Sequence, residues 1–398
     1  MLKWLVGIVV ALVIAVTVAL FNTDKHVRHL VTHLPTDRDV LFWSIEQRDG
    51  AFRTMDWFPF LAGANVIAAG DDVKPLPQGR PLALDVDIDQ YMQDQRSAAI
   101  VIIHDGQVRF EKYGLDFTAE GRWTSFSVAK SFTSTLVGAA IADGHIKSID
   151  DMVSDYIPDL RGSVYDDVSI EQLLTMTSGV QWNEDYEDPD SDVARFNNHE
   201  PAPGVDATVS YMRNLSREAP AGSKWVYKTG ETNLIGVLVS SATGKTLSDY
   251  LSEKIWRPYG MQQDATWLLG LTGHEISGCC IQAATRDYAR FGMFMLDGGK
   301  VNGNAVLPEG WIEKATVTSV DTYYSSKGYG YQWWTYSDGS YAAQGIFGQG
   351  IFIDPQRKLV VASNSNWPRA SHHPTVGQQR DAFYLAVQAA IDSENAAE

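Results

Sequence analysis

The longest run of apolar positions lies at the N-terminus of the chain. Residues 4–21 carry no charged side chain, and Lys3 precedes them. As an α-helix, this run would span roughly 27 Å, close to the thickness of the hydrocarbon core of a bilayer. The pattern predicts a transmembrane helix over residues 1–22, retained as a membrane anchor, and the alternative is a cleaved signal peptide. Basic residues flank the run on both sides, so their charge does not orient it.

A predicted N-terminal extension covers residues 23–75. It contains His26, His29 and His33, which would share one face of a helix. Because no carboxylate or Cys completes a ligand set, we favour a helix at the membrane surface over a metal site. The stretch Pro-Leu-Pro-Gln-Gly at the end of the extension predicts a turn or linker before the main domain, residues 76–398.

Strand and helix periods alternate through the main domain. Residues 98–104 form an apolar run, Asp105-Gly106 is a favoured two-residue turn, and residues 107–113 alternate, which predicts a β-hairpin. Helical spacing of apolar positions recurs over residues 127–142, 169–176, 231–242, 247–255, 285–296 and 376–395. Further strands are predicted over residues 330–336, 350–353 and 359–364. This order predicts an α+β fold, with an antiparallel sheet built from both ends of the domain, flanking helices and an inserted, mostly helical region.

The charge balance narrows the class of partner. The chain has 49 acidic and 32 basic residues, which gives a formal net charge of −17. Nucleic-acid binding needs a basic face, and no run of Lys and Arg departs from this average. We therefore predict no nucleic-acid partner and turn to small-molecule chemistry.

The two cysteines of the chain, Cys279 and Cys280, are adjacent. Adjacent residues rarely meet the geometry of a disulfide. We therefore favour two small buried hydrophobic residues, with a strained redox pair or a metal site as the alternatives. Two cysteines do not fix the compartment, because a chain of this length can form a sizeable core without disulfides.

Ser127 and Lys130 form the candidate catalytic pair. They are three positions apart at the start of a predicted helix, so both lie on one face and the amine can reach the hydroxyl. A desolvated Lys loses its proton more easily and can act as a general base. The N–H groups at the helix N-terminus suit a developing oxyanion. The spacing alone is a weak signal, since about one chance match is expected in a chain of this length.

Other short segments give this pair its context. They are Leu-Leu-Thr-Met-Thr-Ser-Gly at 173–179, Trp-Asn-Glu-Asp-Tyr at 182–186, Tyr-Lys-Thr-Gly at 227–230, Ala-Thr-Arg-Asp-Tyr-Ala-Arg-Phe-Gly at 284–292, Gly-Tyr-Gly-Tyr-Gln-Trp-Trp at 328–334 and Ala-Gln-Gly-Ile-Phe-Gly at 343–348. In residue types and order, the chain resembles the serine β-lactamase and penicillin-binding-protein superfamily over about residues 40–395. It resembles most the class C-like branch that contains 6-aminohexanoate-dimer hydrolases and related esterases. The resemblance implies a β-lactamase/transpeptidase-like fold.

The resemblance also implies roles for individual residues. Ser127 matches the nucleophile, Lys130 matches its basic partner, and Tyr227 matches the tyrosine that shuttles protons to the leaving group. Gly345 matches the glycine of the motif on the last strands. Ile346, which follows it, would then supply a backbone N–H to the oxyanion hole alongside that of Ser127.

Two departures from the family pattern bear on the substrate. Thr229 stands where β-lactamases of this type have Asn, and Ala343 stands where their strand motif begins with Lys or His. The cation that grips the carboxylate of a β-lactam is therefore missing at that position, with Lys228 as a possible substitute. The departures favour other small esters or amides over β-lactams.

Aromatic and acidic side chains around these motifs complete the candidate pocket. Trp182 and Trp334 are candidates for its substrate-binding walls, although packing in the core would explain either one equally well. Glu184 or Asp185 could activate a water molecule, but an ordinary loop charge is the favoured interpretation.

We therefore predict a serine hydrolase that cleaves small ester or amide substrates through an acyl-enzyme, with no metal and no cofactor. The N-terminal helix would hold the domain at the cell membrane, outside the cytoplasm, in the periplasm; after cleavage it would be secreted. The alternatives are a D-Ala-D-Ala peptidase or weak β-lactamase, and a non-catalytic binding or sensor protein of the same fold. The intact trio of Ser127, Lys130 and Tyr227 argues against the last.

Overall fold

The largest sheet joins the two ends of the main domain. Its eight strands are ordered β3-β2-β14-β13-β12-β11-β10-β9, and each pair of neighbours is antiparallel. The computed structural model describes residues 2–22, 25–57, 62–324, 326–370 and 374–397. In it, the strands of this sheet are β2 (Ser97–His104), β3 (Gln107–Tyr113), β9 (Val320–Asp321), β10 (Gly328–Tyr329), β11 (Trp334–Thr335), β12 (Tyr341–Gln344), β13 (Gly350–Asp354) and β14 (Leu359–Ser365). The pairing of β2 with β14 confirms the predicted sheet built from both ends.

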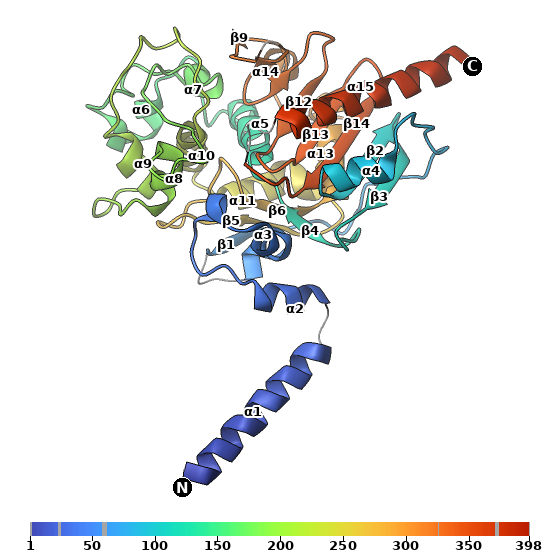
Figure 1. Ribbon diagram of the computed structural model, residues 1–398. Coiled ribbons are helices and arrows are strands. Elements are labelled where there is room, and N and C mark those ends of the chain that lie inside the picture. The colour runs from blue at the N-terminus through green and yellow to red at the C-terminus, as the bar shows by residue number, and fades with distance from the viewer. Residues whose placement is uncertain (1, 23–24, 58–61, 325, 371–373, 398) are drawn as a thin grey trace.

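The helices of the main domain follow most of the predicted periods. They are α4 (Ile88–Asp94), α5 (Val128–Ala142), α6 (Val153–Tyr156), α7 (Ile170–Leu174), α8 (Asp192–Arg195), α9 (Ala207–Met212), α10 (Thr229–Thr243), α11 (Leu247–Leu251), α12 (Arg257–Tyr259), α13 (Thr285–Leu296), α14 (Trp311–Ala315) and α15 (Pro374–Ala397). Single turns of other helix types are η1 (Val40–Phe42), η2 (Met55–Trp57), η3 (Pro158–Leu160), η4 (Phe196–Asn198) and the π-helical η5 (Ser252–Trp256). Helices α6 to α9 form the inserted helical region, on the left of Figure 1.

Helices cover both faces of the large sheet. Side chains that alternate along β2 point to opposite faces. Ile100 and Ile102 belong to a core cluster with residues of α15, whereas Val101 and Ile103 belong to a larger cluster that includes residues of α13. Figure 1 shows these two helices on either side of the strands. Burial on both faces explains why β2 reads as a continuous apolar run in the sequence.

A second, smaller sheet places the start of α5. Its antiparallel strands are ordered β1-β5-β6-β4 and are β1 (Ala64–Ile67), β4 (Arg122–Thr124), β5 (Ala265–Leu268) and β6 (Ile281–Ala284). These strands show no period in the sequence, because they have three or four residues and most are buried too completely to alternate. Strand β4 leads directly into the turn before α5. A further strand pair is β7 (Lys300–Val301) with β8 (Asn304–Ala305).

The strand predicted over residues 330–336 is wrong in its first half. The chain turns between β10 and β11, where Gln332 has a φ of 63°. The Gln332 side chain is buried and donates hydrogen bonds to the carbonyls of Leu173 and Leu174 over 3.1 and 2.8 Å. These bonds satisfy carbonyl groups at the C-terminal end of α7, so they tie the helical region to the large sheet.

The apolar N-terminal run forms helix α1 (Leu2–Asn22), which points away from the rest of the protein in Figure 1. Among the helices that the structure describes, however, none combines the length and apolar character needed to cross a membrane. The predicted transmembrane helix is therefore not supported. Residues 23–75 include α2 (Lys25–Thr32), α3 (Ile45–Ala51) and β1. Trp43 and Phe52, on either side of α3, are buried in the core.

Candidate active site

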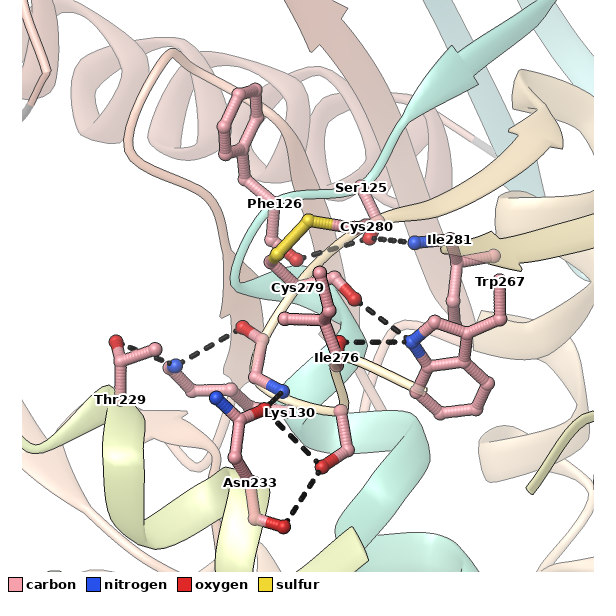
Figure 2. Close-up of a disulfide and its surroundings, with 12 residues drawn as sticks. Ser125, Phe126, Lys130, Thr229, Asn233, Trp267, Ile276, Cys279, Cys280 and Ile281 are labelled. Carbon is pink, nitrogen blue, oxygen red and sulfur yellow. Dashed lines mark hydrogen bonds between the residues drawn. A yellow bond between two sulfur atoms is a disulfide. The ribbon is translucent and has the colours of Figure 1, made fainter. Parts of the chain in front are cut away.

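Ser127 lies at the turn between β4 and α5. Phe126, which precedes it, has a φ of 42°, in the left-handed region that is costly for a residue other than glycine. The turn is held by Ser125, whose N–H donates to the carbonyl of Ile281 over 2.8 Å. Ser125 Oγ accepts from the Ile281 N–H over 3.0 Å (Figure 2). Ser127 makes no side-chain capping bond with α5, so its hydroxyl is available to its neighbours.

Lys130 follows in the first turn of α5 and is buried. Its Nζ donates to Thr229 Oγ1 over 2.9 Å and to the carbonyl of Gly278 over 3.0 Å, as Figure 2 shows. Burial lowers the pKa of Lys130 to about 8, and the negative charge of Glu184 opposes this shift. At pH 7 about a tenth of the side chain is therefore a neutral amine, and this fraction grows as the pH rises through about 8.

Tyr227 lies just before α10 and faces the same pair. Its ring centroid is 5.2 Å from Lys130 Nζ. Burial raises the pKa of Tyr227 well above its usual range, while a hydrogen bond with Ser127 acts in the opposite direction. The structure thus brings together the three side chains that the sequence singled out, with the phenol in its protonated form.

Gly345 lies directly against the segment that carries Ser127. A Cβ atom at Gly345 would come within 2.9 Å of the carbonyl oxygen of Ser125, so a larger residue would displace the turn. Ile346 follows in the link between β12 and β13. Within the part of the chain that the structure describes, neither the Ser127 N–H nor the Ile346 N–H donates to an acceptor. Two backbone donors remain for a ligand, as the oxyanion-hole prediction requires.

The two predicted wall residues occupy different positions. Trp334 stacks on Tyr227, with ring centroids 5.7 Å apart and planes at 14°, and is half-buried. Trp182 is buried and packs edge-on against Phe196 and Tyr211. The structure therefore places Trp334 at the site and Trp182 behind it, in the helical region.

Neither candidate position supplies a cation for a substrate carboxylate. Ala343 is buried in β12. Lys228 is fully buried, and its Nζ lies 3.3 Å from the carbonyl of Val226 and 3.9 Å from a carboxylate oxygen of Glu231. The ammonium group of Lys228 interacts with these buried groups and is not exposed to a ligand, so Lys228 does not substitute for the missing cation. Among the described residues, no group of three or more His, Cys, Asp or Glu side chains could hold a metal ion.

Cys279 and Cys280 form a disulfide, which corrects the interpretation of two unpaired hydrophobic residues. The Cα atoms are 3.7 Å apart, and Cys280 adopts a φ of 77°. Both residues line a cavity of about 110 Å³ beside the N-terminal segment. The disulfide directly follows Gly278, the residue whose carbonyl accepts from Lys130.

The two hydrogen-bond partners of Lys130 could not be predicted from the sequence. Thr229 is distinguished there only by its departure from the family pattern. Gly278 acts through its backbone and is 148 positions away in sequence, so no side-chain pattern could reveal it. The absence of a side chain at Gly278 is the one sign of its role. A Cβ atom at this position would lie 2.9 Å from Thr229 Cγ2 and 3.1 Å from Lys130 Nζ.

A Ser, a Lys and a Tyr gathered at the start of a buried helix, beside an antiparallel sheet, define a serine hydrolase of the β-lactamase type. The chain belongs to the Beta-lactamase family, whose model matches residues 84–384. The resemblance inferred from the sequence is thereby confirmed, as is the prediction of a serine hydrolase.

Individual relatives match between about half and most of the chain. The 6-aminohexanoate-dimer hydrolase of Paenarthrobacter ureafaciens is 29% identical over 324 residues, which are 77% of this chain and 82% of that protein. A β-lactamase of Pseudomonas fluorescens is 25% identical over 188 residues, 45% of this chain and 49% of that one. Among solved structures, a Bacillus anthracis protein named "putative 6-aminohexanoate-dimer hydrolase" superposes with a TM-score of 0.77 at 23% identity, covering 88% of this chain and 95% of the other.

Proposed function

We propose that the protein hydrolyses small ester or amide substrates through an acyl-enzyme formed on Ser127. The observation that carries the proposal is the environment of Lys130, a buried amine with a pKa of about 8 in the same helical turn as Ser127. The relatives named for amide hydrolysis support a carbonyl substrate. The absence of a cation at Ala343 supports a substrate that needs no carboxylate anchor.

In the proposed acylation step, Ser127 Oγ attacks the substrate carbonyl carbon and its proton passes to the neutral amine of Lys130. The carbonyl oxygen becomes an oxyanion, which the N–H groups of Ser127 and Ile346 stabilise. Once Lys130 has accepted the proton it is charged, and burial makes this charged form unfavourable. The cluster therefore needs a quick route for the proton to the leaving group.

Tyr227 provides that route in the proposed mechanism. Its raised pKa keeps the phenol protonated, so it can donate to the departing oxygen or nitrogen while it receives the proton held by Lys130. The bond from the carbonyl carbon to the leaving group breaks, and the acyl group remains on Ser127. Water then attacks the acyl carbon and gives a proton to the same Lys130–Tyr227 pair. The bond from the acyl carbon to Ser127 Oγ breaks, Ser127 Oγ takes up that proton, and the carboxylic acid product leaves.

A fluorophosphonate probe combined with ester hydrolysis tests the proposal. We expect the probe to label Ser127, and Ser127→Ala and Lys130→Ala each to lose most turnover while circular dichroism shows a folded protein. Because the two residues act as a unit, the double variant should be little worse than either single one. Normal labelling or activity of Ser127→Ala would contradict the mechanism. A wild-type protein that binds substrates but neither labels nor turns over would instead be a non-catalytic binding protein.

We also propose that the main domain acts outside the cytoplasm. The Cys279–Cys280 disulfide supports this, because disulfides persist mainly in oxidising compartments. Cell fractionation tests the proposal, and recovery of the protein with cytoplasmic markers would contradict it.

A further inference from the structure

Glu184 is a carboxylate beside the candidate catalytic cluster, and among the described residues its hydrogen-bond partners are all donors. Its Oε1 accepts from the hydroxyls of Thr229 and Tyr186, the latter over 2.6 Å. Its Oε2 accepts from the Thr229 N–H over 2.9 Å and from the indole N–H of Trp182. An ionised carboxylate accepts at both oxygens and donates nothing, so this form satisfies all four contacts. Such a complete donor set is not that of an ordinary loop charge.

The hydrogen bond from the Thr229 hydroxyl to Glu184 fixes the direction of that hydroxyl. A hydroxyl has one proton, and here that proton is donated to Glu184. The lone pairs of Thr229 Oγ1 therefore face Lys130 Nζ, which lies 2.9 Å away (Figure 2). The backbone bond to the second oxygen of Glu184 keeps the first residue of α10 in place.

The direction of the Thr229 hydroxyl in turn decides where the amine of Lys130 can act as a base. A neutral amine has two N–H donors and one lone pair. Thr229 Oγ1 and the Gly278 carbonyl take the two donors, which leaves the lone pair for the neighbouring Ser127. If the Thr229 proton turned toward Lys130 instead, the lone pair would be consumed there and lost to Ser127.

We propose that Glu184 is a positioning residue, which acts through the Thr229 hydroxyl to direct the lone pair of the Lys130 amine toward Ser127. The inference rests on the proposed function, in which Lys130 is the base for Ser127. Glu184 itself touches none of the reacting atoms. It also stabilises the helix start that carries Thr229, because a negative charge near a helix N-terminus is favourable.

The charge of Glu184 gives this role an electrostatic signature. The amine of Lys130 faces the hydroxyl of Thr229, the carbonyl of Gly278 and the ring of Tyr227. In the described part of the chain, the charge that shifts its pKa is that of Glu184. This charge raises the pKa of Lys130 against the effect of burial. Removing it should therefore lower the pKa of Lys130, and the neutral, basic form should appear at a lower pH.

The experiment compares Glu184→Gln with three other variants by kcat/KM for p-nitrophenyl butyrate across pH. Glu184→Gln should lower the plateau roughly 10- to 100-fold. The NH2 group of Gln cannot accept a hydrogen bond, so the two donors that face one of the Glu184 oxygens would lose their acceptor. The midpoint of the ascending limb should move to lower pH. Thr229→Val should also lower the plateau, and Thr229→Ser should restore most of it. Asp185→Asn, which neutralises the exposed neighbouring carboxylate, should match the wild type in both respects.

A second readout separates this inference from the proposed function. Nitrogen-15 NMR titration of Lys130 Nζ reports the coupling to Glu184 without turnover, and its pKa should be lower in Glu184→Gln. If the wild-type protein showed no hydrolysis or probe labelling, the proposed function would fail while this titration still tested the coupling. A Glu184→Gln protein with a wild-type plateau would overturn the positioning role. So would a lower plateau with an unmoved limb and an unchanged Lys130 pKa, since that would indicate a purely structural contact.

Discussion

Lys130 shows how a single buried side chain acquires chemical activity from its surroundings. Its two hydrogen bonds go to a hydroxyl and a carbonyl, which stabilise an ammonium less than a carboxylate in contact would. Desolvation therefore dominates and lowers its pKa to about 8. The sequence predicted the pair from the spacing of Ser127 and Lys130, but it could not predict the two acceptors, because both come from distant segments.

The pH dependence of activity should report this pKa. Only the neutral amine accepts the Ser127 proton, so kcat/KM should rise with pH through about 8 and then level off. Between pH 7 and pH 9 the neutral fraction grows from about a tenth to about nine tenths, a roughly tenfold rise. Steady-state ester hydrolysis, corrected for spontaneous hydrolysis, would measure this.

A second buried lysine provides the matched control for that profile. Burial also lowers the pKa of Lys327 to about 8, although it is paired with Asp381 over 2.9 Å. Lys327→Gln should leave the ascending limb in place, since Lys327 is not part of the Ser127 cluster. A limb that moved in Lys327→Gln, or a flat profile in the wild type, would contradict the assignment of the base to Lys130.

The site is assembled by short elements that approach from different parts of the chain. The turn before α5 carries Ser127, and the first turn of α5 carries Lys130. The start of α10 carries Thr229, and the segment between β5 and β6 carries Gly278. That segment is held by a hydrogen bond to α10, in which Asn233 Oδ1 accepts from the Gly278 N–H over 2.6 Å. The periodic helices could be predicted from the sequence, whereas this irregular segment could not, because its order depends on single polar contacts.

Reduction of the Cys279–Cys280 disulfide should disturb this segment and lower activity. Cys279 is half-buried and lines a cavity, so a small reductant can reach it, and reduction converts the disulfide to two thiols. The Gly278 carbonyl would lose a rigid neighbour and Lys130 a fixed acceptor. We expect kcat/KM to fall about tenfold, since misplacing a catalytic group by a fraction of an ångström has effects of this order.

The double variant Cys279→Ser/Cys280→Ser controls for effects of the reductant elsewhere. It should resemble the reduced wild type and should not respond to the reductant. Mass spectrometry would confirm the thiol state of each sample. Full activity of a demonstrably reduced wild-type protein would show that the disulfide does not support the position of the Gly278 carbonyl.

At the scale of the whole molecule, the spacing of apolar residues predicts the antiparallel sheet from both ends of the domain and the inserted helical region. The order of the short motifs along the chain predicts the family. The small sheet β1-β5-β6-β4 could not be predicted, because its strands are too short to show a period. Strand β1 lies within residues 23–75, far from its partner β5 in sequence. These long-range pairings depend on tertiary packing and leave no local signal.

The charges around the site favour some substrates over others. A β-lactam carries a carboxylate that needs a cation, whereas a short-chain ester needs only the nucleophile, the base and the oxyanion donors. Ala343 presents no charge, and Lys228 is fully buried beside Glu231, so neither position holds such a carboxylate. A lost charge-assisted hydrogen bond is worth about 1.5–3 kcal/mol, or roughly ten- to a hundredfold in affinity.

We therefore expect p-nitrophenyl acetate or butyrate to be hydrolysed clearly, and a chromogenic cephalosporin to be turned over less efficiently by roughly ten- to a hundredfold in kcat/KM. Linear amides such as aminohexanoate oligomers should be slower than the esters, because an amine leaves less readily than a phenolate and depends on a proton from Tyr227. One enzyme preparation should be assayed on all three substrate types, with Ser127→Ala as the background. Replacing Tyr227 by Phe should then reduce amide turnover more than ester turnover, because the phenolate leaves without a proton. A cephalosporin that matched the esters would show that another cation holds its carboxylate, and equal losses on ester and amide in Tyr227→Phe would contradict the proton relay.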